Sequence, residues 1–190
     1  MPNRVRRMQD LSLHILDIVE NSIAAGATKI EINIDENIKK NRLVLAIKDN
    51  GKGMDKKTLT MVLDPFYTTK KTRRIGLGLS MLAQATKEAE GKFDIKSEKK
   101  KGTAVTAQFV HNHIDRKPIG NMTETITDLI ATNGSEIDFI YKHRKNRKVL
   151  VFDTRTLKKE LKDISITDPE ILSYLKKEIK KQLSSIGVRT

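Results

Sequence analysis

The chain has 190 residues, of which 37% are hydrophobic and 32% charged, and its formal net charge at pH 7 is +13. It contains no cysteine, which excludes disulfides, cysteine nucleophiles and iron–sulfur ligation and fits a reducing, cytoplasmic setting. No run approaches the ~20 apolar residues of a membrane span, and no apolar segment follows the basic N-terminus. Neither a membrane partner nor a secretory signal is therefore expected.

The first half of the chain predicts helices that alternate with paired strands. The apolar residues over 10–27 recur with a helical period; Ser12 can cap this helix and Gly26 can end it. Segments 28–36 and 41–49 alternate apolar and polar residues, which predicts a hairpin. The other elements expected here are a short helix at 55–64 that begins at Asp55, an irregular stretch at 64–78, a helix at 79–90 that Gly91 stops, and strands at 92–98 and 103–110.

Beyond residue 113 the pattern changes. Residues 115–121 have the composition of a linker. The elements expected after it are a helix at 122–134, a hairpin over 136–153, and helices at 154–163 and 168–187. We predict an α/β two-layer sandwich over 1–113, with helices on one face of a mixed sheet. Residues 114–190 are expected to form a small α+β extension, which is a candidate partner-binding module.

Positive charge is concentrated in the runs "RVRR", "KKTRR", "KSEKKK" and "KHRKNRK". A nucleic-acid surface is one interpretation of such runs. Aromatic residues make up only 4% of the chain, which leaves little to stack on bases. Runs of like charge are usually solvated faces, so nucleic acid is the less favoured alternative. The run at 142–148 lies between two alternating apolar segments and is typical of a solvated hairpin tip.

The first helix carries a polar stripe on an otherwise apolar surface. On a helical wheel, His14, Asp17 and Asn21 fall on one side. A solvated helix edge would explain the stripe without any function. An asparagine oxygen can also bind Mg²⁺, and a carboxylate one turn away can orient or deprotonate a water molecule.

The stretch "DNGKGM" places Asp49 directly after a predicted strand. A plain hairpin turn is the simplest interpretation of its Asn-Gly pair. A second interpretation is a binding pocket. Gly51 and Gly53 have no side chain, so a flat ligand can lie against their backbone. A rigidly held carboxylate can then accept a hydrogen bond from the exocyclic amine of adenine.

Further along the chain, "GLGLS" (76–80) opens a predicted helix, and glycine-rich backbone at a helix N-terminus can hold phosphate. The asparagine helix, "DNGKGM", "DPFYTTK", "GLGLS" and "KKGTAVT" follow one another in this order. Over about residues 10–110 this order resembles the superfamily of gyrase, heat-shock chaperone, histidine kinase and MutL ATP-binding domains (GHKL), which has the Bergerat fold. "IVENSIAAGATKIEI" resembles the MutL-type ATPases, and "DPFYTTKKTRRIGLGLS" resembles the histidine kinases.

The resemblance implies ATP and Mg²⁺ as cofactors and a role for each matching residue. It implies that Asn21 binds Mg²⁺ and that Asp49 accepts the adenine amine. Thr103 would support Asp49 and an ordered water. The other implied ligand contacts are Gly51 and Gly53 along the base with Met54 as a neighbour, Phe66, Thr68, Thr69 and Lys70 at the start of the ATP lid, and Gly76, Gly78 and Leu79 at the phosphates.

One position departs from the pattern of the hydrolytic members. They usually carry glutamate four residues before the metal asparagine, whereas this chain has Asp17, which is one methylene shorter. Glu20 points about 100° away from Asn21 on the helix. Asp17 is therefore the candidate catalytic residue, and an aspartate there could polarise a water or a protein hydroxyl. His14 could hydrogen-bond Asp17, although a packed neutral histidine is the favoured alternative.

The resemblance implies an ATP-dependent ATPase switch or a protein kinase-like regulator that acts on a protein partner. Only about ten residues precede the ATP-binding region, so a self-phosphorylating sensor kinase with its dimerisation hairpin is not expected. Three alternatives stay open. They are a serine protein kinase of the anti-sigma type, a MutL-like DNA-associated ATPase, and an ATP sensor that does not hydrolyse.

Overall fold

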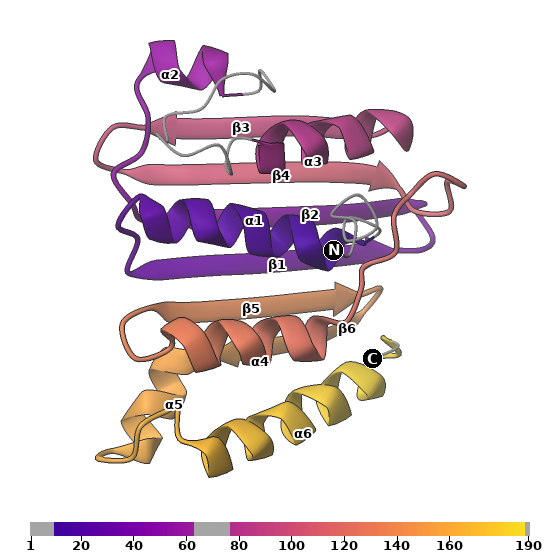
Figure 1. Cartoon of the computed structure of the whole chain (residues 1–190). Helices are drawn as coiled ribbons and strands as arrows, with labels where there is room; N and C mark the ends of the chain where they lie inside the picture. Colours follow the sequence, from indigo (N-terminus) through magenta and orange to yellow (C-terminus); the bar gives the residue numbers. More distant parts are fainter. Residues whose placement is uncertain (1–9, 63–76, 189–190) are drawn as a thin grey trace, which may run out of the picture.

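The computed structural model describes residues 10–62 and 77–188 (Figure 1). Within these ranges the predicted elements are present, with ends that shift by a few residues. Five of the predicted site residues lie outside the described residues: Phe66, Thr68, Thr69, Lys70 and Gly76. Their roles stay predictions.

The described strands form one six-stranded sheet in the order β3-β4-β2-β1-β5-β6. The pair β1–β5 is parallel and every other neighbouring pair is antiparallel, so the sheet is mixed. The strands are β1 (Lys29–Asn37), β2 (Arg42–Asp49), β3 (Lys92–Glu98), β4 (Gly102–Val110), β5 (Asp138–Lys145) and β6 (Lys148–Asp153).

Helices α1, α3 and α4 lie on one face of this sheet (Figure 1). The predicted two-layer α/β architecture, with helices on one face of a mixed sheet, is confirmed. The helices are α1 (Leu11–Ala24), α2 (Lys56–Met61), α3 (Leu77–Glu88), α4 (Met122–Asn133), α5 (Thr154–Leu161) and α6 (Pro169–Ser185). None of these described helices has the length and hydrophobicity needed to cross a bilayer.

The two-residue period of the strands decides which face the helices cover. In β1, Ile30, Ile32 and Ile34 are buried, while the residues between them are half-buried. The same alternation continues in β2 and β5. Because successive side chains point to opposite faces, one face of the sheet packs on the helices and the other stays open. Helix α1 contributes Ile15, Ile18 and other buried residues to the core between them.

The N-terminal cap of α1 differs from the prediction. Asp10, not Ser12, is the N-cap residue, and its Oδ1 accepts from the backbone N–H of Leu13 at 3.3 Å. Ser12 lies inside the first turn and donates its hydroxyl to the same oxygen at 2.6 Å. A carboxylate can accept both bonds, and with its cap at Asp10 the helix begins two residues earlier than a cap at Ser12 would give. Gly26, with φ +75°, follows the helix end as predicted.

Residues 114–190 continue the same sheet. Strand β5 pairs in parallel with β1 over its full length, and its Phe139 and Tyr141 are buried in the same core. Strand β6 then extends the sheet beyond β5. In the structure the two parts of the chain share one sheet and one core. The division into two domains at residue 113 stays a prediction.

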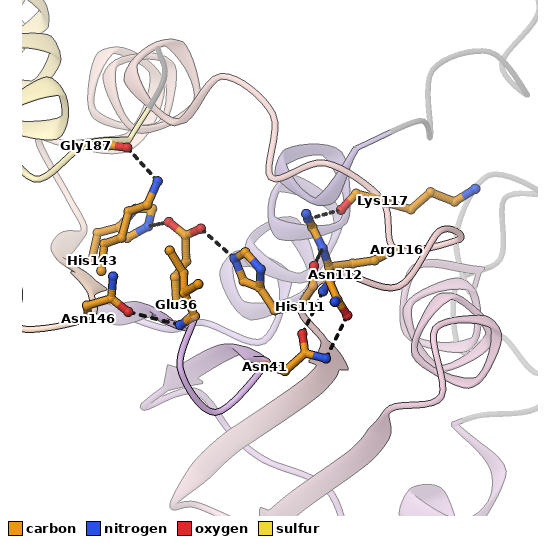
Figure 2. A network of polar contacts seen from close by, with 11 residues as sticks. Glu36, Asn41, His111, Asn112, Arg116, Lys117, His143, Asn146 and Gly187 are labelled. Atoms are coloured by element: carbon orange, nitrogen blue, oxygen red, sulfur yellow. Dashed lines mark hydrogen bonds and ion pairs between the residues drawn. The ribbon is translucent and has the colours of Figure 1, made fainter.

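A buried carboxylate joins the two parts at one end of the sheet (Figure 2). Glu36, which is 6% exposed, lies at the end of β1. Its Oε1 is 2.9 Å from Nε2 of His143 on β5, and its Oε2 is 3.2 Å from Nε2 of His111, just after β4. The other ring nitrogen of His143 lies 2.7 Å from the hydroxyl of Tyr141.

These contacts change the acidity of the groups involved. Burial alone raises the pKa of Glu36, but the hydrogen bonds from His143 and His111 outweigh it, and the net result is a lowered pKa. Burial, together with the charge of Glu36, raises the pKa of Tyr141 well above its usual value. Glu36 therefore favours its ionised form in the folded chain.

We expect Glu36→Gln to lower the free energy of unfolding at neutral pH by about 1–3 kcal/mol, because it weakens bonds to a charged acceptor. A lowered native pKa stabilises the fold above the ordinary glutamate pKa of about 4.3, and this contribution is lost as pH falls through the native pKa. The variant should lack that acid-dependent component. Urea unfolding between neutral and acid pH measures it. The control is Glu20→Gln, which makes the same change at an exposed residue and should keep the parent's dependence of stability on pH. If the parent, Glu36→Gln and Glu20→Gln all showed the same pH dependence, Glu36 would not be the group responsible.

Candidate functional site

Asp49 is the centre of the candidate site. It ends β2 on the helix-covered face and is only 7% exposed. Its Oδ1 accepts from the backbone N–H groups of Gly51 at 2.9 Å and Thr103 at 3.2 Å. Its Oδ2 accepts from the hydroxyl of Ser22 on α1 at 2.8 Å. Three different parts of the chain therefore fix the orientation of this carboxylate.

The number of acceptor positions decides what Asp49 can still bind. A carboxylate offers about four lone-pair positions, two on each oxygen. Both positions on Oδ1 are used by Gly51 and Thr103, whereas among the described residues Oδ2 accepts only from Ser22. One position on Oδ2 stays open to a donor from outside. A single, rigidly oriented acceptor in a buried setting suits an amine such as that of adenine.

The glycines after Asp49 are required by close contacts. A Cβ on Gly51 would lie 3.0 Å from the Cβ of Ala25, at the end of α1, and Lys52 donates its N–H to the carbonyl of Ala25 at 2.9 Å. A Cβ on Gly53, where φ is +62°, would lie 2.0 Å from the carbonyl oxygen of Glu98. The loop therefore packs directly on α1 and on β3. Contact of either glycine with a base stays a prediction.

Thr103 supports Asp49 through its backbone, as the N–H bond shows. The preceding Gly102 has φ +93°, and a Cβ there would lie 2.0 Å from the carbonyl oxygen of Asp49. Ser97 on β3 links the same region, because its hydroxyl is 2.9 Å from that of Thr103 and accepts from the N–H of Met54 at 2.8 Å. An ordered water beside Thr103 stays a prediction.

Helices α1 and α3 come close together at Asp17. A Cβ on Gly78 would lie 2.9 Å from the Cβ of Asp17, so only glycine allows this approach. Helix α3 begins at Leu77, which places Gly78 and Leu79 in its first turn, where backbone N–H groups have no partner within the helix. The side chain of Leu79 is buried in the core, which leaves only its backbone for a ligand. The structure thus brings Asp17 and the first turn of α3 together.

Asn21 lies one helical turn beyond Asp17 on α1 and is half-buried. Its side-chain amide forms no hydrogen bond with the part of the chain that the structure describes. An amide oxygen of this kind fits Mg²⁺, which takes few protein ligands and keeps waters or phosphate oxygens. The described residues contain no group of three acidic, histidine or cysteine side chains that could hold a metal by themselves. Most ligands would therefore come from phosphate and water.

Residues that the sequence analysis missed hold the site together. Ser22 occupies the buried face of α1 and orients Asp49. Asn50 accepts from the N–H groups of Thr28 and Lys29, both at 2.9 Å, and so ties the loop to the start of β1. A polar residue on the apolar face of a helix, such as Ser22, is a signal that could have been noticed, whereas the contact of Asn50 depends on strand pairing.

His14 belongs to the packing of α1. It is buried, and burial lowers its pKa, partly opposed by Asp10 and reinforced by Lys117. Its Nδ1 has no hydrogen-bond partner within residues 10–62 and 77–188. These properties support the packed neutral histidine over a partner for Asp17.

Comparison with known proteins agrees with this geometry. Residues 8–113 match the family described as histidine kinase-, DNA gyrase B- and HSP90-like ATPases. This match covers more than half of the chain, and it contains α1, the Asp49 loop and Thr103. The chain belongs to this family of ATPases, as the resemblance predicted.

Related sequences come from two kinds of regulatory protein. A sensor protein of Shewanella frigidimarina is 37% identical over 103 residues, which are 53% of this chain and 16% of that protein. The anti-sigma F factor of Clostridium kluyveri is 29% identical over 110 residues, which are 56% of this chain and 73% of that protein. The chain therefore spans a small part of the sensor protein and most of the anti-sigma factor.

Solved structures share the fold. The N-terminal domain of a DNA repair protein aligns with a TM-score of 0.56 and 18% identity, covering 95% of this chain and 57% of that one. The MutL ATPase domain of Aquifex aeolicus, complexed with ADP, aligns with a TM-score of 0.51 and 18% identity, covering 81% of this chain and 68% of that one. At 95% coverage, the first alignment must include much of residues 114–190.

The close approach of Gly102 to Asp49 predicts that Gly102→Ala lowers the free energy of unfolding by about 2 kcal/mol or more. The control is Gly26→Ala. Gly26 also has positive φ, but a Cβ there meets nothing within 4 Å, so we expect a loss of only about 1 kcal/mol. Urea unfolding of both variants measures the difference. If both variants lost the same free energy of unfolding, the close contact of residue 102 with the Asp49 backbone would not be the cause.

Proposed function

We propose that this chain binds ATP with Mg²⁺ around Asp49 and acts as an ATPase switch or a protein kinase-like regulator of a protein partner. The observation that carries the proposal is the carboxylate of Asp49, which is buried, held by three donors and left with one acceptor position on Oδ2. The family match supports nucleotide binding over the same residues.

Different residues of the site would bind the base, the phosphates and the metal of ATP. The adenine amine donates to Oδ2 of Asp49, and the side-chain-free surface of Gly51 and Gly53 lies along the base. The first turn of α3, at Gly78 and Leu79, donates its N–H groups to phosphate oxygens. Asn21 would hold Mg²⁺, which when bound neutralises phosphate charge.

Asp17 is the proposed catalytic residue. Its contact with Gly78 places it beside the N-terminus of α3, where we expect the terminal phosphate. A carboxylate there can orient a water molecule, giving hydrolysis, or the hydroxyl of a partner, giving phosphoryl transfer. The contact supports a role for Asp17 in either reaction.

The anti-sigma F factor favours the protein-regulator alternative, because this chain covers most of its length. A serine protein kinase of the anti-sigma type is the kinase version of this proposal, beside the ATPase switch. The DNA repair domain favours a MutL-like ATPase, since its fold aligns with nearly the whole chain. Because that likeness concerns the fold only, we rank a DNA-associated function below the regulation of a protein partner.

We expect Asp49→Asn to fold but to weaken ATP binding by roughly 10- to 100-fold. The amide oxygen of the variant can accept from Gly51 and Thr103, which leaves its NH₂ group where Oδ2 was. A donor there faces the donor of adenine and removes the selectivity for ATP over GTP. Calorimetry with both nucleotides measures this. The matched variant Ser22→Ala should weaken binding less and keep selectivity, and unchanged ATP binding by Asp49→Asn would show that the pocket is misassigned.

A second prediction separates binding from turnover. Asn21→Ala should remove the Mg²⁺-dependent part of ATP affinity, because an alanine offers no oxygen ligand. Asp17→Ala should leave ATP affinity nearly unchanged and remove phosphate release or transfer. Calorimetry with and without Mg²⁺, followed by phosphate-release assays, tests both. If Asp17→Ala keeps full turnover, another residue activates the nucleophile.

A further inference from the structure

Strand β6 is an edge of the described sheet. Its Leu150 and Phe152 are buried on the helix-covered face, while Val149 and Val151 are 43% and 58% exposed on the open face. No backbone bond links β6 to a described segment outside the sheet. In an antiparallel edge strand every second residue directs its N–H and C=O groups outward. Exposed valines and free backbone groups therefore occur together.

The β5–β6 hairpin is also strongly positive. Residues 142–148 contain no acidic residue and five cationic ones, namely Lys142, Arg144, Lys145, Arg147 and Lys148. None of them forms an ion pair among residues 10–62 and 77–188, whereas seven other lysines and arginines there do. Two acidic residues lie near the hairpin: Arg144 stands opposite Asp35 of β1 in the strand register, and the charge of Lys145 acts on Glu36. Lys145 and Lys148 donate only to the backbone carbonyls of Gly187 and Ser185.

Strand register places charge directly beside the valines. Arg144 lies opposite Val149, and Lys142 lies opposite Val151. Residues directly opposite on neighbouring strands have side chains on the same face, so both cations stand on the open face with the valines. On the open face, the apolar groups of the edge strand β6 therefore lie side by side with the positive groups of β5.

We propose that the β6 edge, with the cationic residues of 142–148, docks an extended acidic segment of a partner protein, which adds to the sheet as a further strand. Backbone pairing along β6 supplies affinity. Lys142 and Arg144 lie on β5, one strand further in, and their long side chains reach across Val151 and Val149 to acidic side chains of the added strand, which supplies specificity. The proposal rests on the proposed function for the role of that partner. The docking itself needs no nucleotide, because Asp49 lies on the helix-covered face.

Charge and composition favour an acidic protein segment at β6 over a second copy of this chain or a nucleic acid. A second copy of the chain would bring the same five cations against themselves, which is unfavourable. A nucleic acid would use the cations but would gain nothing from Val149 and Val151, and aromatic residues for base stacking are scarce. An acidic, partly apolar strand satisfies both features.

The experiment uses the full chain and a fluorescent synthetic peptide of alternating glutamate and valine, matched in length to β6. Without nucleotide, we expect saturable binding by fluorescence anisotropy, weakened by salt, and slower hydrogen exchange at the β6 amides. Lys142→Glu should weaken binding several-fold, and Val151→Thr should weaken it less. The control is Lys92→Glu, the same charge change on the exposed face of the other edge strand, β3, and it should leave binding unchanged.

Three outcomes would overturn the proposal. If a lysine–valine peptide bound as tightly as the glutamate–valine peptide, the surface would not select acidic partners. If Lys92→Glu weakened binding as much as Lys142→Glu, the effect would come from the net charge of the protein and not from this surface. Duplex DNA that competes with the peptide and responds to Lys142→Glu would assign the surface to nucleic acid. The variant Asp49→Asn does not alter the β6 surface, so it should still bind the peptide. Measuring peptide and ATP binding in this variant therefore distinguishes a failure of the docking proposal from a failure of the proposed function.

Discussion

The site depends on the compensation of one buried carboxylate. An ionised group taken out of water is strongly unfavourable unless donors replace its hydration. Asp49 receives these donors from α1, from its own loop and from β4, so the three elements must meet for the carboxylate to be satisfied. The same bonds leave one acceptor position on Oδ2, which is where we propose that the adenine amine binds.

Steric constraints reinforce this arrangement. Gly53 and Gly102 each bring backbone to where a side-chain carbon would lie 2.0 Å from a carbonyl oxygen. Gly78 allows a close approach between two helices, because a Cβ there would lie 2.9 Å from the Cβ of Asp17. Residues that look like flexible loop glycines are therefore sites of close packing. In this chain, the glycines of the proposed nucleotide site are required by contact with the neighbouring element, whether or not a ligand also lies against their backbone.

Local signals in the sequence predicted the elements well. Alternation gave the strands to within a residue or two, because burial on one face imposes a two-residue period. Three features had no local signal: the parallel pairing of β5 with β1, the bond between Glu36 and His143, and the contact of Asn50 with the start of β1. Each joins residues far apart along the chain, so it follows from topology. The cap at Asp10 was missed because both Asp10 and Ser12 are good capping residues, and only their geometry separates them.

The position of β1 has a consequence for synthesis. This strand lies between β2, which follows it at once, and β5, which is made about a hundred residues later. Until residue 145 has left the ribosome, β1 can pair only with β2, and the side of β1 that later receives β5 stays open. The first part of the chain can then assemble its hairpin, but Glu36 stays without His143. Non-local pairing of this kind slows folding and prolongs the exposure of apolar strand to other nascent chains.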